Sequence, residues 1–328
     1  MALSVRDIRE LLHHRLMPAL PVPFTIERTI HSESHVRMAE YMLDMPIAGV
    51  AIWAHTGRGL YLSESERAEI LTHWREAMPS ALVIAGAGCP ANENISSDDE
   101  YFRGARRMAE HAKSLGADAV LCYPPSRFRD RNDRERMEAT LEYHRQISMA
   151  GLPLILFYLY ESAGGMKYSH TLLNELFKLP DVIGIKMATL DSVVTFQDVA
   201  RMIKSEHPDR LIITGEDRFL GYSLMMGADS ALIGMGAALT GLQAEMMKAF
   251  YTQDVNNFFY RSQWVDRFSF ATFHQPMEGY ISRMLYALAW MDVVSRDAIY
   301  DPWGPALDAG DFDAVGDFLT ELPTELKR

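Results

Sequence analysis

A lysine inside an otherwise apolar run is the residue in this sequence best suited to covalent chemistry. The run covers residues 181–189 and reads Asp-Val-Ile-Gly-Ile-Lys-Met-Ala-Thr, which is typical of a buried β-strand. Because side chains alternate between the two faces of a strand, we expect Val182, Gly184 and Lys186 to share one face. Burial disfavours the ammonium form and lowers the lysine pKa, which converts lysine into an amine nucleophile. The alternative is a lysine at a strand end that reaches water or a carboxylate.

The elements that must position this lysine repeat along the chain. Eight apolar runs of strand length alternate with amphipathic helical patterns, and this alternation favours parallel pairing and closure into a (β/α)8 TIM barrel. An open doubly wound sheet is the second possibility, although no G-x-G-x-x-G follows the first strand. The predicted strands lie at residues 17–22, 47–53, 82–88, 119–123, 153–158, 181–189, 211–215 and 230–235.

The domain organisation follows from where the strand pattern ends. We expect residues 1–240 to form the barrel together with a short N-terminal helix at 4–14. Residues 241–328 contain only helical patterns, so they are predicted to form a C-terminal helical appendage packed beside the barrel.

In such barrels the chemistry lies at the carboxyl ends of the strands. There a lysine beside a tyrosine that ends the preceding strand is a useful pair, because lysine forms an imine and the phenol relays protons. We therefore expect Tyr158 to act with Lys186. The other polar or glycine candidates at strand ends are His55, Thr56, Gly57, Arg58, Tyr123, Arg127, Gly215, Glu216 and Asp217.

The composition limits the classes of partner that the protein is expected to bind. The net charge of -12 and the isoelectric point near 5.4 argue against nucleic acid or an anionic membrane surface. Cys89 and Cys122 are too few for a disulfide framework, and with no signal-peptide pattern at the N-terminus they favour a cytoplasmic protein. The pair at residues 13–14 is the only adjacent histidine pair and lacks further ligands at metal spacing, so we expect neither a metal nor another cofactor.

At this point the chain resembles the dihydrodipicolinate synthase and N-acetylneuraminate lyase family of class I, Schiff-base-forming aldolases. The resemblance covers about residues 17–240 and is collinear. Its most specific segments are Gly184-Ile-Lys186, which matches the Schiff-base lysine, and Leu156-Phe-Tyr158 followed by Gly165, which matches the tyrosine strand. The remaining matching segments are residues 18–24, 54–58, 116–125, 215–217 and 227–229.

The resemblance implies a role for each site residue. Lys186 would attack the C2 carbonyl of pyruvate or another 2-oxo acid, Tyr158 would carry protons, and Thr56 would belong to the hydroxyl relay. The backbone N–H groups of the turn at 55–57, which includes Gly57, would hold the substrate carboxylate, as expected for a glycine-containing turn that leads towards a helix. Backbone groups of Gly215 and Leu232 would line the same pocket.

The sequence also departs from the family pattern. His55 replaces a hydroxyl residue and Arg58 a glutamate of the second-strand loop, Ser126-Arg127 replaces a tyrosine pair, and Ala163 stands where synthases have an arginine. His55 either replaces the hydroxyl relay with an imidazole or fills space beside the pocket. Arg58 and Arg127 either bind a second anionic group of the substrate or form structural ion pairs. These departures argue against a dihydrodipicolinate synthase.

The resulting prediction is a class I lyase that makes or breaks a carbon–carbon bond through an imine at Lys186. One alternative is a dehydratase that acts on a keto-deoxy sugar acid through the same imine. Another is a barrel that binds a 2-oxo acid without turning it over. The resemblance also implies a homo-oligomer, either a dimer or a tetramer.

Overall fold

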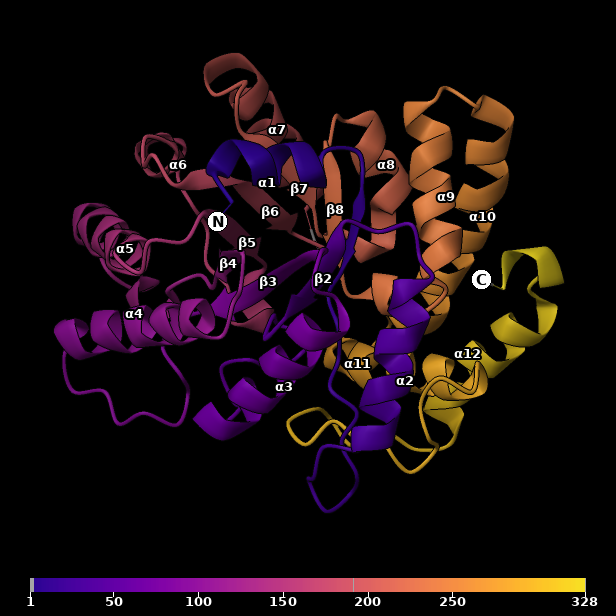
Figure 1. Ribbon diagram of the computed structural model, residues 1–328. Coiled ribbons are helices and arrows are strands. Elements are labelled where there is room, and N and C mark those ends of the chain that lie inside the picture. Colours follow the sequence, from indigo (N-terminus) through magenta and orange to yellow (C-terminus); the bar gives the residue numbers. More distant parts are fainter. Residues whose placement is uncertain (1–2, 191, 328) are drawn as a thin grey trace.

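A computed structural model describes residues 3–190 and 192–327 of the chain, so residues 1, 2, 191 and 328 lie outside the described part. Eight parallel strands form one sheet in the order β1-β8-β7-β6-β5-β4-β3-β2, drawn in Figure 1. The strands are β1 (Leu16–Pro18), β2 (Gly49–Ile52), β3 (Leu82–Ala87), β4 (Ala119–Cys122), β5 (Leu154–Leu159), β6 (Val182–Ala188), β7 (Leu211–Thr214) and β8 (Ser230–Ile233).

The sheet closes between its first two strands. The N–H of Leu20 donates to the carbonyl of Ala51 at 2.9 Å, and the N–H of Ala48 donates to the carbonyl of Leu16 at 2.9 Å. These bonds join β1 to β2 and complete the ring. The (β/α)8 TIM barrel predicted from the alternating pattern is therefore confirmed, with strand bounds that differ from the predicted ones by a few residues.

Helices follow the strands and cover the outside of the barrel. Several begin at the residues that the sequence marks as caps: Ser63 accepts the N–H of Glu66 at 3.2 Å, and Glu66 accepts the N–H of Ser63 at 2.6 Å, which forms a capping box. The helices are α1 (Val5–Leu12), α2 (Ser32–Leu43), α3 (Glu64–Ala77), α4 (Asp98–Ser114), α5 (Asp133–Ser148), α6 (His170–Phe177), α7 (Val193–Glu206), α8 (Leu220–Met225), α9 (Thr240–Tyr251), α10 (Val255–Thr272), α11 (Tyr280–Trp290) and α12 (Gly310–Glu321).

Apolar side chains pack in two layers, one inside the barrel and one between the sheet and the helices. Strand β5 shows the division clearly: Phe157 and Leu159 belong to the inner cluster, whereas Leu156 and Tyr158 belong to the outer one. Strand alternation therefore decides which side chains can reach the interior of the barrel.

Strand β6 contains one extra residue in its pairing with β5. Over a single step along β5, the partner in β6 advances from Val182 to Gly184, which is a β-bulge. As a result Ile183 points into the barrel and Val182 points outwards. The prediction that Val182 shares the face of Lys186 is wrong, because the extra residue reverses the alternation at this point.

The two ends of the chain cover different parts of the barrel. Ile8 and Leu12 of α1 belong to the inner cluster, so α1 lies across one end of the barrel, as Figure 1 shows. The C-terminal helices begin at α9, close to the predicted boundary at residue 240, but the outer cluster continues through them to Leu326. The appendage therefore shares its core with the barrel.

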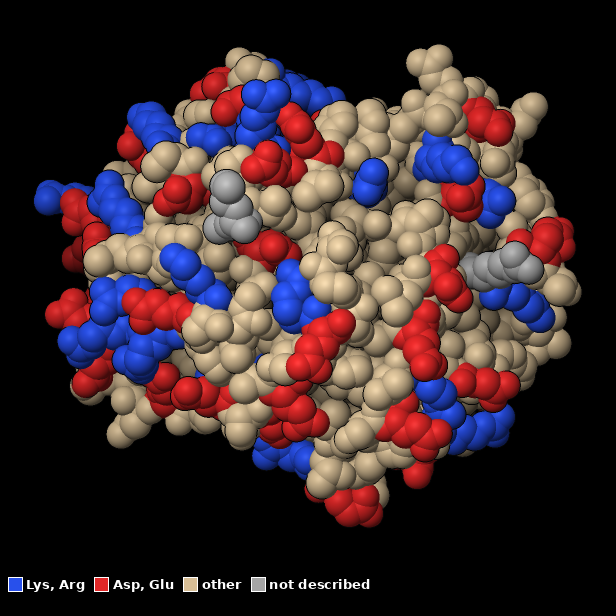
Figure 2. All heavy atoms as spheres, viewed as in Figure 1, with Lys and Arg blue, Asp and Glu red and all other residues tan. Residues whose placement is uncertain are grey.

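The surface carries mixed charge. On the face shown in Figure 2, basic side chains lie among acidic ones, including over α4 and α5 at the left. Among the described residues, none of the helices is both long enough and apolar enough to cross a lipid bilayer.

Candidate active site

Lys186 lies inside the barrel near the carboxyl end of β6. It pairs in register with Phe157 of β5, its Nζ atom lies 4.4 Å from the centre of the Phe157 ring, and the residue is only 5% exposed. Gly215, which follows β7, makes room for it, because a Cβ atom at that position would lie 2.7 Å from Lys186 Cε. The predicted burial of the amine is present.

Electrostatics favour a reactive amine. Burial lowers the pKa of Lys186 from 10.5 to about 8, while the negative charges of Asp217 and Glu216 oppose this shift. Burial raises the pKa of Asp217, and its carboxylate accepts the N–H of Met235 at 2.7 Å. Asp217, which the sequence places just after β7, is therefore an acidic neighbour that interacts electrostatically with the lysine.

Glu216 has a structural connection to the lysine strand. Its side chain accepts hydrogen bonds from the N–H and the hydroxyl of Thr189, at 2.6 and 2.7 Å, and from the N–H of Leu190 at 2.8 Å. Burial raises its pKa to about 7, although these hydrogen bonds act in the opposite direction. Glu216 thus holds the turn directly after the lysine strand.

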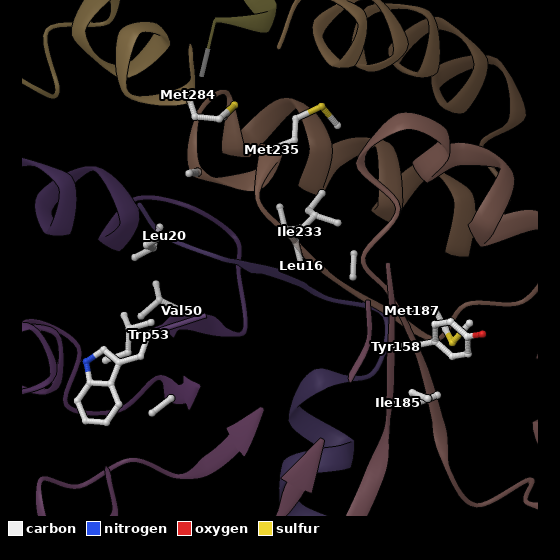
Figure 3. Packing of buried hydrophobic residues seen from close by; sticks show 14 of the residues in the cluster. Leu16, Leu20, Val50, Trp53, Tyr158, Ile185, Met187, Ile233, Met235 and Met284 are labelled. Atoms are coloured by element: carbon white, nitrogen blue, oxygen red, sulfur yellow. The ribbon is translucent and has the colours of Figure 1, made fainter. Parts of the chain in front are cut away.

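Tyr158 does not face Lys186. It pairs in register with Met187, belongs to the outer cluster, and its ring centre lies 5.4 Å from that of Tyr168. Figure 3 shows its ring beside Met187. The predicted pairing of Tyr158 with Lys186 is therefore wrong, because strand alternation brings the neighbouring Phe157 to the lysine instead.

The turn after β2 can bind an anion through only part of its backbone. The N–H of Gly57 donates to the carbonyl of Ala54 at 2.9 Å, and that of Arg58 donates to the carbonyl of His55 at 3.1 Å. Within residues 3–190 and 192–327, no hydrogen-bond acceptor faces the N–H groups of His55 and Thr56. These two amides are the ones available for a carboxylate, so Gly57 contributes the shape of the turn rather than a donor.

Arg58 is held by two carboxylates from the C-terminal region. Its guanidinium donates to Asp301 at 2.8 and 3.1 Å and to Glu278 at 2.8 Å, and the residue is only 8% exposed. The structure therefore shows the ion-pairing alternative for Arg58. A substrate anion would have to displace one of these carboxylates.

Glu278 joins three residues at the barrel mouth. It accepts hydrogen bonds from His55 at 2.9 Å, from Arg58 at 2.8 Å and from Tyr160 at 3.2 Å. Burial would raise its pKa, but the hydrogen bonds and positive charges of His55 and Arg58 outweigh burial and lower the pKa to about 2. Glu278 therefore stays ionised, and His55 is oriented by a carboxylate.

Thr56 has a hydrogen-bonded partner that sequence reasoning missed. Its Oγ1 atom lies 3.0 Å from the phenol oxygen of Tyr280, the first residue of α11. The Tyr280 ring is stacked on Phe273 at a centroid distance of 4.5 Å. A hydroxyl pair thus lies where the sequence predicts a hydroxyl relay.

The remaining predicted residues lie in two places. Leu232 of β8 is fully buried in the inner cluster and is not among the residues that line the pocket at the barrel mouth. Arg127 pairs with Asp98 at 3.3 Å and lies over the ring of Tyr101 at 5.9 Å. Arg127 therefore makes a structural ion pair near the pocket rather than an open anion site.

A pocket of about 370 Å³ opens at the carboxyl ends of the strands. The ring of Tyr123, in its wall, lies 6.2 Å from that of Phe157, over which Lys186 is placed. Phe157 and Lys186 thus lie next to this wall but are not among the residues that line the pocket. Its walls combine aromatic, hydroxyl and charged residues: His55, Arg58, Leu60, Tyr61, Tyr101, Tyr123, Pro124, Ser126, Leu159, Ser162, Ala163, Gly164, Glu278 and Trp303.

Four residues of the candidate site were missing from the prediction. Glu278, Tyr280 and Asp301 are separated from the turn after β2 by more than 200 residues, and no local pattern links such distant segments. Tyr160 lies two residues beyond Tyr158, so the aromatic run at the end of β5 was a usable signal for it. Among the described residues, no group of three or more histidine, cysteine or acidic side chains is placed to hold a metal ion.

Comparison with known proteins places this closed barrel in a family that includes lyases. The chain belongs to the dihydrodipicolinate synthetase family, whose sequence profile matches residues 12–312. Its members include lyases, and this chain is a lyase of that family.

The chain is similar to several N-acetylneuraminate lyases. Those of Escherichia coli (strain SMS-3-5 / SECEC) and Enterobacter sp. (strain 638) are each 27% identical over 220 residues, covering 66% of this chain and 67% of the relative.

Solved structures share the fold. N-acetylneuraminate lyase from Mycoplasma synoviae superposes with a TM-score of 0.74 at 20% identity over 95% of this chain and 98% of that one. Dihydrodipicolinate synthase from Oceanobacillus iheyensis gives 0.79 at 18% identity over 97% and 98%.

Proposed function

We propose that the protein is a class I lyase that forms a Schiff base between Lys186 and pyruvate or another 2-oxo acid. The observation that carries the proposal is the buried amine near the end of β6, with a pKa lowered by burial. The N–H groups of His55 and Thr56 would receive the substrate carboxylate. The resulting iminium would accept the electrons of the carbon–carbon bond that breaks.

The acceptor or leaving group would carry no second carboxylate. Arg58 is neutralised by Glu278 and Asp301, Arg127 is paired with Asp98, and Ala163 lies in the pocket wall. With its nearby guanidinium groups already paired, the pocket favours an uncharged aldehyde. This supports a relative of N-acetylneuraminate lyases rather than a dihydrodipicolinate synthase.

Borohydride trapping tests the imine directly. Incubation with pyruvate and borohydride should add one pyruvate less one oxygen atom to the intact mass of the protein, because imine formation releases water and reduction adds two hydrogens. Lys186→Ala should abolish the adduct, whereas Lys178→Ala, at an exposed position on the surface, should retain it. A wild-type protein without adduct, or an adduct that persists in Lys186→Ala, would refute the proposal.

One observation favours a second candidate, a protein that binds a 2-oxo acid without turnover. The lysine faces Phe157, which has no hydroxyl to move protons. A panel of keto-deoxy sugar acids and aldehydes separates the possibilities. Pyruvate release indicates an aldolase, loss of water without pyruvate release indicates a dehydratase, and an adduct or thermal stabilisation without product indicates binding alone.

Two further expectations belong to the same proposal. We propose a homo-oligomer, supported by the exposed aromatic residues Phe259, Tyr260 and Phe270 on α10, which mass measurement in solution would test. We also propose a cytoplasmic location, supported by the two free, buried cysteines, which fractionation of cells would test.

A further inference from the structure

We propose that Tyr280, acting through Thr56, supplies the proton-transfer hydroxyl for the imine chemistry of Lys186. This inference rests on the proposed function and adds a catalytic residue to it. The starting observation is that β5 places Phe157 at the lysine and turns the phenol of Tyr158 to the outer layer. A hydroxyl that serves Lys186 must therefore come from another element.

Backbone contacts place the hydroxyl pair next to the lysine's charged neighbour. A Cβ atom at Gly234 would lie 2.9 Å from Thr56 Oγ1 and 2.9 Å from Tyr280 Cε2. The N–H of Gly234 and that of the next residue, Met235, donate to Asp217, which in turn interacts with Lys186. Thr56 and Tyr280 thus lie beside the glycine whose N–H binds Asp217, the acid that interacts electrostatically with the amine.

Tyr280 has the surroundings of a group that holds its proton until it is needed. Burial and the negative charge of Glu278 raise its pKa well above 10, and the hydrogen bond from Thr56 opposes them. The phenol is therefore protonated at neutral pH, and a phenolate formed there would be a strong base. Neither Thr56 nor Tyr280 is exposed to bulk water, so the proton would pass between them directly.

The alternative phenol is already committed elsewhere. Tyr160 donates to Glu278 at 3.2 Å, and Glu278 remains ionised because its pKa is lowered to about 2, despite the opposing effect of burial. The phenol proton of Tyr160 therefore points at a carboxylate. The hydroxyl of Tyr280 instead shares a hydrogen bond with that of Thr56, whose own N–H is one of the two available amides of the turn.

The proton balance closes over one reaction cycle. When the carbinolamine loses water, the nitrogen lone pair forms the C=N bond, and the departing hydroxide takes the proton of Thr56, which is replaced from Tyr280. When the carbon–carbon bond breaks, its electrons move into the iminium to give an enamine. The proton of the hydroxyl on the leaving carbon then returns through Thr56 to Tyr280. The enamine carbon then takes a proton from Tyr280 through Thr56, and one water molecule hydrolyses the resulting iminium, which releases pyruvate and the free amine and returns the proton to Tyr280. The water added here replaces the water lost when the imine formed.

The test is the rate of borohydride-trappable adduct formation in four variants. Tyr280→Phe keeps the ring on Phe273 and should slow adduct formation at least about 100-fold, the usual contribution of a positioned acid–base group, with an unchanged half-saturating pyruvate concentration. Thr56→Val should have a similar effect, and Thr56→Ser should restore most of the rate. Tyr286→Phe, on the same helix but stacked on Phe312, should match the wild type.

The combination of Tyr280→Phe with Thr56→Val should be no slower than the slower single variant, because both remove one relay. Adduct formation by Tyr280→Phe within about threefold of the wild type would overturn the inference, as would a large loss in Tyr160→Phe with none in Tyr280→Phe. If Tyr280→Phe does not fold, Thr56→Val decides, since a rate equal to that of Thr56→Ser overturns the relay. In each of these cases the wild-type protein still forms the adduct. Failure of the relay is therefore distinguishable from failure of the proposed function, in which the wild type forms no adduct.

Discussion

The pH dependence of imine formation follows from the position of Lys186. At pH 7, a lysine with a pKa of about 8 has about 300-fold more free amine than one with the ordinary value of 10.5. The rate of adduct formation with pyruvate should therefore rise about tenfold per pH unit at low pH and level off above about pH 8. Stopped borohydride reactions followed by intact mass would measure this profile.

The variant Asp217→Asn tests whether this carboxylate contributes to the pKa of Lys186. The charge of Asp217 raises the pKa of Lys186 against the larger effect of burial, so its removal should move the break in the profile to lower pH. Asparagine retains an oxygen that can accept the N–H of Met235. The matched control is Asp198→Asn, which removes the same charge from a position on α7 whose side chain is 65% exposed, and it should leave the break in place.

Two results would refute this reasoning. A rate that continues to rise beyond pH 10 would show that Lys186 titrates as an ordinary solvated amine. A break that moves to higher pH in Asp217→Asn would show that the carboxylate does not stabilise the ammonium form.

Three more predictions concern individual side chains. Gly215→Ala should leave a folded protein with little adduct formation, because the new methyl group would meet Lys186 Cε at 2.7 Å; a melting curve and the trapping assay measure the two effects, and a wild-type rate would contradict the prediction. Arg58→Leu should lower the free energy of unfolding by about 3–5 kcal/mol, because Asp301 loses its buried partner; urea unfolding measures this, and a loss below about 1 kcal/mol would match only an exposed pair. Tyr158→Phe should leave the trapping rate unchanged, because the phenol lies on the outer face, and a large loss would restore the original assignment.

The barrel was predictable because its evidence is local and repeated. Each strand is a short apolar run between turn residues, and eight such runs separated by helical patterns leave few arrangements. The burial of Lys186 was one of two alternatives from the same local reasoning, and the apolar residues on both sides of it favoured burial.

The orientation of the β5 aromatics was not predictable in this way. Residues 157–160 read Phe-Tyr-Leu-Tyr, so both faces are apolar or aromatic and no alternation of polarity identifies the inner one. A shift of one residue exchanges the faces, and the assignment of Tyr158 failed for that reason. The bulge at Ile183 likewise has no sequence pattern that would predict it.

The C-terminal part of the site was missed because its contacts are distant along the chain. The hydrogen bond between His55 and Glu278 spans 223 residues, and that between Thr56 and Tyr280 spans 224. The helical pattern of α11 predicts the helix but not the barrel loop that it meets. The ion pair was one of the two alternatives predicted for Arg58. Its partners could not be named without the fold.

The pairing of Arg58 with Glu278 and Asp301 has a consequence for the newly synthesised chain. During translation the barrel strands emerge first, but Glu278, Tyr280 and Asp301 are added much later. Until then the guanidinium lacks its two anions, and the mouth of the barrel lacks a wall. A nascent or proteolytically shortened chain that ends before residue 278 would therefore carry the nucleophilic lysine in an unfinished enclosure.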